Sequence, residues 1–136
     1  MKRTLRFDFG EATIREVGIV HARTVHNAEI NLEQAKAYLE IIDLLTENTP
    51  HVTIVDISSI KHISKEARAF ISTSTSNSGN TVALAFISNS FAARTIASFF
   101  LTVNRPTYPV KIFKDSLTAH QWAKNEYCRF STRMAS

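Results

Sequence analysis

Two short apolar runs constrain the fold more than any other feature of this sequence. Residues 52–57 (VTIVDI) and 82–87 (VALAFI) are nearly continuous in apolar character. Such runs are typical of strands that are covered on both faces. A segment with helical periodicity separates them, and strands joined through a helix need a crossover connection. The two runs therefore predict a parallel section of sheet with helices packed against it.

The remaining strands are predicted from shorter patterns. Apolar and polar residues alternate from Leu5 to Phe9, which is the period-two pattern of a half-buried strand. Residues 12–15 and 17–23 predict two further strands, so that the chain begins with a β-meander. Val110–Phe113 (VKIF) predicts the last strand.

Four helices are expected between and after these strands. Asn31 precedes the first, with Gln34 in capping-box register, and Asn48 and Pro50 end it. The second is expected from Ser64 over residues 65–73, followed by a polar loop at 72–81 (STSTSNSGNT). Within it, Ser72–Ser78 is either a place for phosphorylation or only a solvated loop. The third spans Ser90 to Val103, and the fourth begins at Asp115 or Ser116.

The predicted order is an N-terminal β-meander followed by α-β-α-β-α-β-α, an α/β fold with a mixed sheet and helices packed against it. No linker or internal repeat interrupts it, so we expect a single domain over residues 1–136. Hydrophobic residues make up 44% of the 136 and charged residues 21%. That balance excludes a disordered or collagen-like chain, and the length suffices for one core without metals or crosslinks.

The same sequence argues against several locations and chemistries. Cys128 is the one cysteine, which suits a reducing compartment, and no secretory signal or membrane span is apparent. Three glycines stand outside any phosphate-binding loop motif, and the five histidines lack metal-ligand spacing. Cys128 is expected in a C-terminal tail. We therefore expect a cytoplasmic protein that is not an enzyme, with no cofactor, no metal, no catalytic residue and no transmembrane segment.

The charge is divided unevenly along the chain. Residues 1–56 contain 6 Lys and Arg against 9 Asp and Glu, whereas residues 57–136 contain 10 against 3. A basic half attracts acidic partners. Its cations are scattered singly and lack interleaved aromatic residues, so no nucleic acid is expected as a partner.

The candidate binding residues lie where the buried strands end and the following helices begin. Ligands of open α/β sheets bind beyond the carboxyl ends of the strands, near helix N-termini. Together these groups would hold a small anion; alternatively, the serines only cap helices and the arginines lie at the surface. Asp56 is either a carboxylate perturbed by burial or the partner of a turn or a cation such as Arg68. The candidate ligand-binding set is Asp56, Ser58, Ser64, Arg68, Ser88, Asn89, Ser90 and Arg94.

About two-thirds of the chain, residues 30–125, resembles small bacterial proteins with a SpoIIAA-like (STAS-like) fold. The residues that carry the resemblance are Ile30–Glu33, Val55–Ser58, Ser64–Arg68, Ala83–Phe86, Ser90, Arg94–Phe100, Asn104–Pro106, Pro109–Phe113 and Ala119–Trp122. The resemblance implies an α/β fold of the STAS type.

It also implies two functions. STAS-type antagonists of anti-sigma factors bind a kinase-like partner and are switched by serine phosphorylation in an Asp-Ser-Ser-Gly-Leu-Gly motif. Here Ser64, Lys65, Glu66 and Ala67 stand where that motif has Asp, two serines and glycine, so the switch itself is not expected. We expect a protein that acts by partner binding in signalling or regulation. The alternative, from the likeness of such folds to CRAL-TRIO-like carriers, is a carrier or sensor of a lipid-like or anionic ligand at the strand ends.

The third predicted helix, Ser90–Val103, has apolar residues on more than one face. One face must cover the sheet, and the other can cover a second molecule. We therefore expect an association surface there, most simply that of a homodimer.

Overall fold

An antiparallel meander begins the fold of this computed structural model, which describes residues 2–135. Its strands are β1 (Arg3–Phe7), β2 (Gly10–Glu16) and β3 (Ile19–Thr24), joined by two tight turns. Alternation places Leu5 and Phe7 of β1 against the core and leaves Arg6 on the opposite face. The predicted β-meander is confirmed.

The apolar runs form the parallel half of the same sheet. These strands are β5 (His51–Asp56), β7 (Thr81–Ile87) and β8 (Val110–Phe113). The strand order is β1-β2-β3-β5-β7-β8, and β3 pairs with β5 in parallel. The predicted mixed sheet is therefore confirmed, with β3 as the strand that joins its antiparallel and parallel halves.

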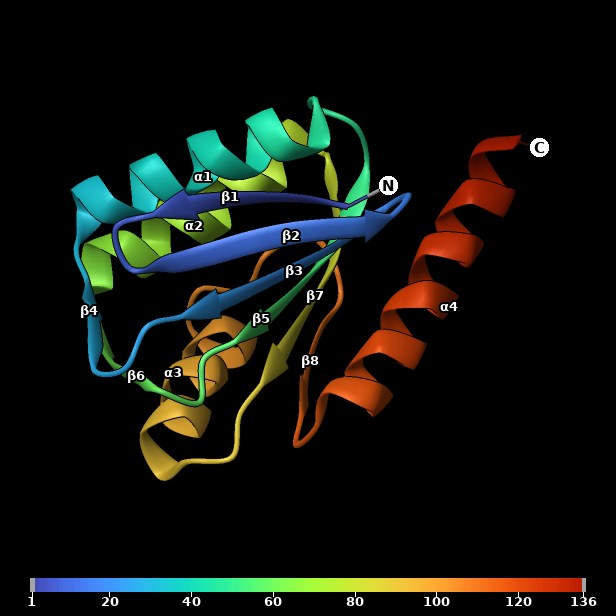
Figure 1. Ribbon diagram of the computed structural model, residues 1–136. Helices are drawn as coiled ribbons and strands as arrows, with labels where there is room; N and C mark the ends of the chain where they lie inside the picture. Colours follow the sequence, from blue (N-terminus) through green and yellow to red (C-terminus); the bar gives the residue numbers. More distant parts are fainter. Residues whose placement is uncertain (1, 136) are drawn as a thin grey trace.

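Helices cover the two faces of the sheet unequally. Helices α1 (Leu32–Thr46), α2 (Lys65–Ser78) and α3 (Phe91–Thr102) lie on one face. Helix α4 (Ser116–Ala135) lies on the other, where it packs mainly against β5 and β7 (Figure 1). We call this second face the outer face. Because α4 crosses only the parallel strands, the outer face of β1 and β2 carries no helix among the described residues.

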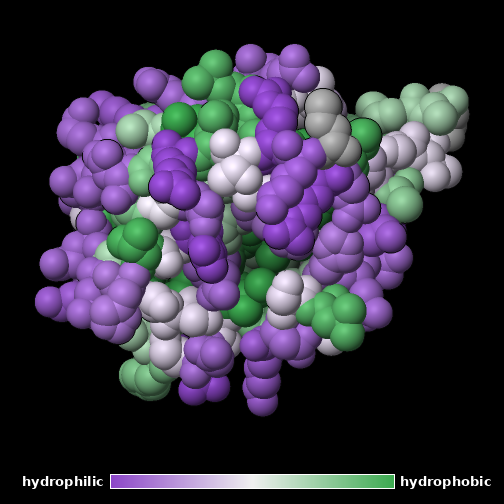
Figure 2. Space-filling model, in the orientation of Figure 1, coloured by the Kyte–Doolittle hydropathy of each residue, from purple (hydrophilic) through white to green (hydrophobic). Residues whose placement is uncertain are grey.

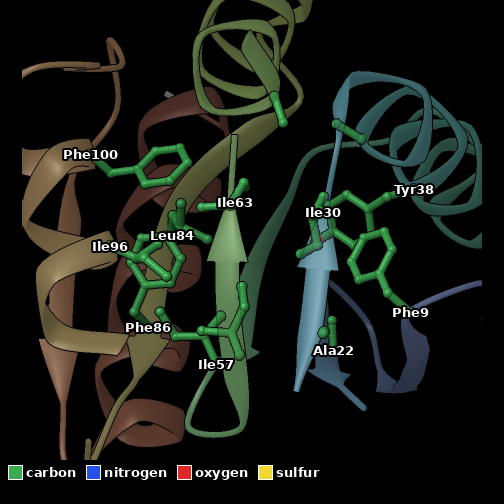
Figure 3. Close-up of a cluster of buried hydrophobic side chains, with 14 of the residues drawn as sticks. Phe9, Ala22, Ile30, Tyr38, Ile57, Ile63, Leu84, Phe86, Ile96 and Phe100 are labelled. Atoms are coloured by element: carbon green, nitrogen blue, oxygen red, sulfur yellow. The ribbon is translucent and has the colours of Figure 1, made fainter. Parts of the chain in front are cut away.

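The core has two parts, one on each face. On the α1–α3 side it contains large side chains, among them Phe9, Tyr38, Phe86 and Phe100 (Figure 3). Under α4 it combines branched residues such as Ile54 with alanines, since Ala83 and Ala85 of β7 and two alanines of α4 are fully buried. Short side chains let the helix approach the sheet closely.

The structure corrects three local predictions. Helix α2 continues to Ser78, beyond the loop expected from residue 72, because side chains of this stretch bond to the segment that follows α3. The Ser72 hydroxyl donates to the Asn104 carbonyl, and that of Thr75 donates to the Ile71 carbonyl at 2.7 Å. Gly79 then ends the helix in the left-handed conformation.

Two short strands were not predicted. Strands β4 (Ala28–Ile30) and β6 (Ile60–Ile63) pair in parallel as a separate two-stranded sheet. Cys128 was expected in a tail, but α4 continues through it, and its side chain is exposed on that helix. Between residues 2 and 135, no helix is long and apolar enough to cross a membrane.

Candidate functional site

Asp56 ends β5 at the carboxyl edge of the sheet, and it holds a turn. Its Oδ1 accepts a hydrogen bond of 2.9 Å from the backbone N–H of Ser58. No cation forms an ion pair with Asp56 among the described residues. Of the roles that the sequence left open, the structure shows the turn-stabilising one.

The predicted serines make local hydrogen bonds. Ser64 Oγ accepts from Ala67 N–H at 3.1 Å and caps α2, and Ser90 Oγ accepts from Ala93 N–H at 3.2 Å and caps α3. Ser88 is buried, and its hydroxyl lies 3.4 Å from the Ser90 carbonyl. Helix capping therefore explains the positions of Ser64 and Ser90 at the starts of α2 and α3.

Arg68 joins α2 to the far end of α3. Its Nη1 donates to the Ile63 carbonyl at 2.9 Å and its Nε to Asn104 Oδ1 at 3.3 Å. The guanidinium group also lies 4.2 Å from the centre of the Phe99 ring. Ser90 is at the opposite end of α3, about 18 Å away for a 12-residue helix.

The eight predicted residues therefore separate into groups. Backbone pairing of residue 57 with residue 87 brings the segments that contain Asp56, Ser58, Ser88, Asn89 and Ser90 together at the carboxyl edge. Ser64 and Arg68 follow β6 in the chain, and Arg68 bonds to the carbonyl of Ile63, the last residue of that strand. Arg94 is exposed on α3, and no acceptor for its side chain occurs within residues 2–135.

A hollow of about 560 Å³ opens at the carboxyl edge beside Asp56. Its other charged residues come from the meander, and the sequence reasoning did not select them. Glu11 of β2 lies opposite Arg23 of β3, and their side chains form an ion pair at 2.8 Å. The strand register places Arg6 of β1 opposite Glu11, and Asp56 of β5 opposite Arg23, so the four charged residues form one row across the sheet. The alternation of charged residues with core residues in β1–β3 was the signal that could have identified this row.

Two histidines distant in sequence meet on the outer face. His120 of α4 lies with Nδ1 3.2 Å from Nε2 of His21 on β3, and its own Nε2 lies 2.8 Å from Glu16 Oε1. Burial, the neighbouring His120 and Arg15 lower the pKa of His21, against an opposing effect of Glu16. No group of three or more metal-ligating side chains occurs within residues 2–135.

The exposed side of α3 carries large apolar residues. Phe91 is 78% exposed at its start, and Leu101 and Val103 are exposed at its end. Ala93, Ile96, Ala97 and Phe100 face the core instead. The one charge on the exposed side of this helix is Arg94. We call this surface, from Phe91 to Val103, the α3 face.

The core on the α1–α3 side contains a cavity of about 60 Å³. Its wall is almost entirely apolar and includes Phe9, Ile30, Tyr38, Phe86 and Phe100, whose side chains converge from both sides in Figure 3. Ligand pockets for molecules of drug size enclose about 300–1,000 Å³. The cavity is therefore too small for a long-chain lipid unless the surrounding side chains move.

This arrangement of sheet and helices defines a SpoIIAA-like fold. A solved structure of an uncharacterized protein from the DUF3478 family with a SpoIIAA-like fold, from Shewanella loihica PV-4, is similar to this chain, with a TM-score of 0.54. The two are 16% identical, and the similarity covers 77% of this chain and 83% of that one. At this identity the likeness shows the fold alone.

The sequence itself assigns the chain to a family. Residues 13–126 match the model of the family described as "Domain of unknown function (DUF7793)", so the chain belongs to that family. No curated protein matches the chain.

Proposed function

We propose that this protein is a non-enzymatic cytoplasmic protein that acts by binding a protein partner in signalling or regulation, and that the partner docks on the α3 face. The observation that carries the proposal is the exposure of Phe91, Leu101 and Val103 along one helix with a single charge among them. Phe91 lies at one end of this face and Leu101 and Val103 at the other, with Thr95 and Ser98 exposed between them. Large apolar side chains exposed on one surface favour protein contacts. The capping role of Ser64 and Ser90 supports a binding protein over an enzyme, because the hydrogen bonds of the described residues tie both hydroxyls to helix N–H groups and to no basic side chain. The exposed thiol of Cys128 suits a reducing compartment.

The simplest partner is a second copy of the chain. Two α3 helices packed antiparallel about a twofold axis would cross near Ser98, whose small side chain permits close approach. Phe91 of one copy would then lie opposite the last turn of the other helix, near Val103. Arg94 would approach that same helix end, where α3 has no basic residue in its last turn to balance the partial negative charge of its carbonyls.

Sedimentation velocity from low to high micromolar concentration tests this proposal. We expect a dimer that Phe91→Asp dissociates, because the carboxylate would be buried without a partner. Val17→Asp is the matched control, since Val17 is 81% exposed in the turn between β2 and β3, away from α3. A monomer at every concentration, or equal dimerisation of both variants, would contradict a second copy as the partner.

A second candidate function is the binding of a small anionic ligand at the strand ends. The hollow of about 560 Å³ beside Asp56 supports it, with Arg6 and Arg23 as the cations in place of Arg68 and Arg94. Native mass spectrometry of protein purified from its own host distinguishes the two functions, because it reports stoichiometry and retained ligand together.

A further inference from the structure

The outer face carries a groove that the α3 face does not include and that borders the hollow beside Asp56, with which it shares Glu11, Arg23 and Asp56. It encloses about 440 Å³ beside the start of α4, a volume in the range of small-molecule sites. Hydrophilic side chains crowd this side of the molecule in Figure 2, which views β1–β3 from the outer face with α4 beside them. The groove exists because α4 covers β5 and β7 and reaches β2 through the contact of His120 with Glu16 at the end of that strand.

Strand pairing fixes the floor of the groove. Thr13 of β2 pairs with His21 of β3, and His21 pairs with Ile54 of β5, so these three side chains form one row across the outer face. Thr4 of β1 pairs with Thr13, and their hydroxyl groups lie 2.9 Å apart. The row therefore offers hydroxyl and imidazole groups next to an apolar surface.

Positive charge is in excess at one end of the groove, along the strands from this row. Lys2 and Arg15 both line the groove, and neither forms an ion pair with a carboxylate of the described residues. At the other end of the groove, Arg23 forms an ion pair with Glu11, and Asp56 adds a second carboxylate. An anion would thus be attracted to the end formed by Lys2 and Arg15.

The histidine pair gives this end a titratable donor. His21 Nε2 faces His120, whereas no described residue bonds to His21 Nδ1. When the pair holds one added proton, His120 can donate to both Glu16 and His21, and His21 then carries its own proton on Nδ1. Without that proton, the His21 tautomer that donates through Nε2 presents a lone pair at Nδ1, which repels an anion.

We propose that this groove is a binding site for a small molecule that carries a phosphate or carboxylate group. Lys2 and Arg15 supply charge, the Thr13 hydroxyl and His21 Nδ1–H donate hydrogen bonds, and the row that contains Ile54 receives the rest of the molecule. The charged groups around His21 are Arg15 and Glu16 on β2, Arg23 on its own strand, Asp56 on β5 and His120 on α4. Binding is accompanied by proton uptake on the histidine pair, so affinity rises as pH falls. The site is separate from the α3 face.

Titration with sodium sulfate, followed by NMR at constant ionic strength, tests the site. Sulfate remains a dianion between pH 6 and 8, so any pH dependence belongs to the protein. We expect affinity to rise by up to about tenfold per pH unit as the pair takes up one proton. Arg15→Gln should weaken binding by about fivefold, since an exposed ion pair contributes up to about 1 kcal/mol. Arg105→Gln, an exposed cation after α3, is the matched control.

Further variants separate the roles of the groove residues. His21→Gln removes the Nδ1–H donor, so it should bind sulfate with a smaller pH dependence than the unmodified protein. If this variant does not fold, the shift of the His21 ring signals on sulfate addition in the unmodified protein tests the same contact. Inorganic phosphate and succinate, compared at one pH, distinguish a tetrahedral from a carboxylate ligand. Equal weakening by Arg15→Gln and Arg105→Gln, or binding that does not change with pH, would overturn the proposal. Phe91→Asp should leave sulfate binding unchanged, so the two proposals fail independently.

Discussion

Gly18 and Gly79 both adopt a left-handed backbone, with φ of 83° and 71°, but their surroundings differ. A Cβ atom on Gly18 would lie 2.3 Å from the ring of Tyr127 on α4, whereas a Cβ on Gly79 would meet nothing within 4 Å. The first glycine is required for its conformation and for the close approach of α4, and the second for its conformation alone.

Alanine substitution at these two positions separates the two contributions. Gly79→Ala should lower the free energy of unfolding by about 1 kcal/mol, the usual effect of a left-handed alanine. Gly18→Ala should lower it by about a further 1–3 kcal/mol, because the methyl group overlaps the Tyr127 ring. Urea denaturation measures both.

The Tyr127 ring provides the control. In a Tyr127→Ala background the overlap disappears, so Gly18→Ala should then cost no more than Gly79→Ala does. Equal effects of the two glycine substitutions in the unmodified chain would show that α4 moves aside without penalty.

At the scale of elements, α2 is held by contacts that reach the segment after α3. Thr75 lies with its hydroxyl 2.7 Å from that of Tyr108, and Ser76 Oγ accepts from the Thr107 N–H at 3.0 Å. Together with the bonds of Arg68, these contacts keep the serine- and threonine-rich half of α2 helical. Such residues have modest helix propensity, so tertiary contacts decide where this helix ends.

The two predicted arginines should respond differently to substitution. Arg68→Met should lower the free energy of unfolding by about 1–3 kcal/mol, because the Ile63 carbonyl and Asn104 lose a charged donor. Arg94→Met should change it by less than about 0.5 kcal/mol, since this side chain is exposed and free of intramolecular bonds. Thermal denaturation of the pair checks this, and a larger loss at position 94 would show that Arg94 is structural.

At the scale of the whole molecule, α4 forms a separate layer that packs on the sheet through buried alanines. Ala119 and Ala123 of α4 are fully buried over Ala83 and Ala85 of β7. The same helix carries His120 and borders the groove through Ser116. Its distance from the sheet therefore sets both stability and the shape of the groove.

Enlarging one of these alanines tests that dependence. Ala123→Leu should lower the free energy of unfolding by about 1–3 kcal/mol and speed amide hydrogen exchange in α4, because the added side chain has no space. Asn125→Leu, an exposed position on the same helix, is the matched control. Identical amide hydrogen exchange in the two variants would mean that the packing of α4 on the sheet does not depend on its buried alanines.

The sequence alone determined most of the fold. The apolar runs of β5 and β7, the alternation in β1 and the Asn31–Gln34 capping box are local patterns, and the structure bears them out. They succeed because burial, strand alternation and helix capping depend on neighbours within a few residues. The carboxyl-edge position of Asp56 follows from the same rules.

Only the tertiary structure decided how the candidate surfaces are composed. In the folded chain Arg68 contacts Asn104, beyond the far end of α3. His21 and His120, which are 99 positions apart in the sequence, are in contact. It also left the outer face of β1 and β2 without a helix, which opened the groove at Lys2 and Arg15. The physical reason is that these contacts depend on where α3 and α4 lie on the sheet. Packing between distant segments sets those positions, and no spacing along the chain encodes it.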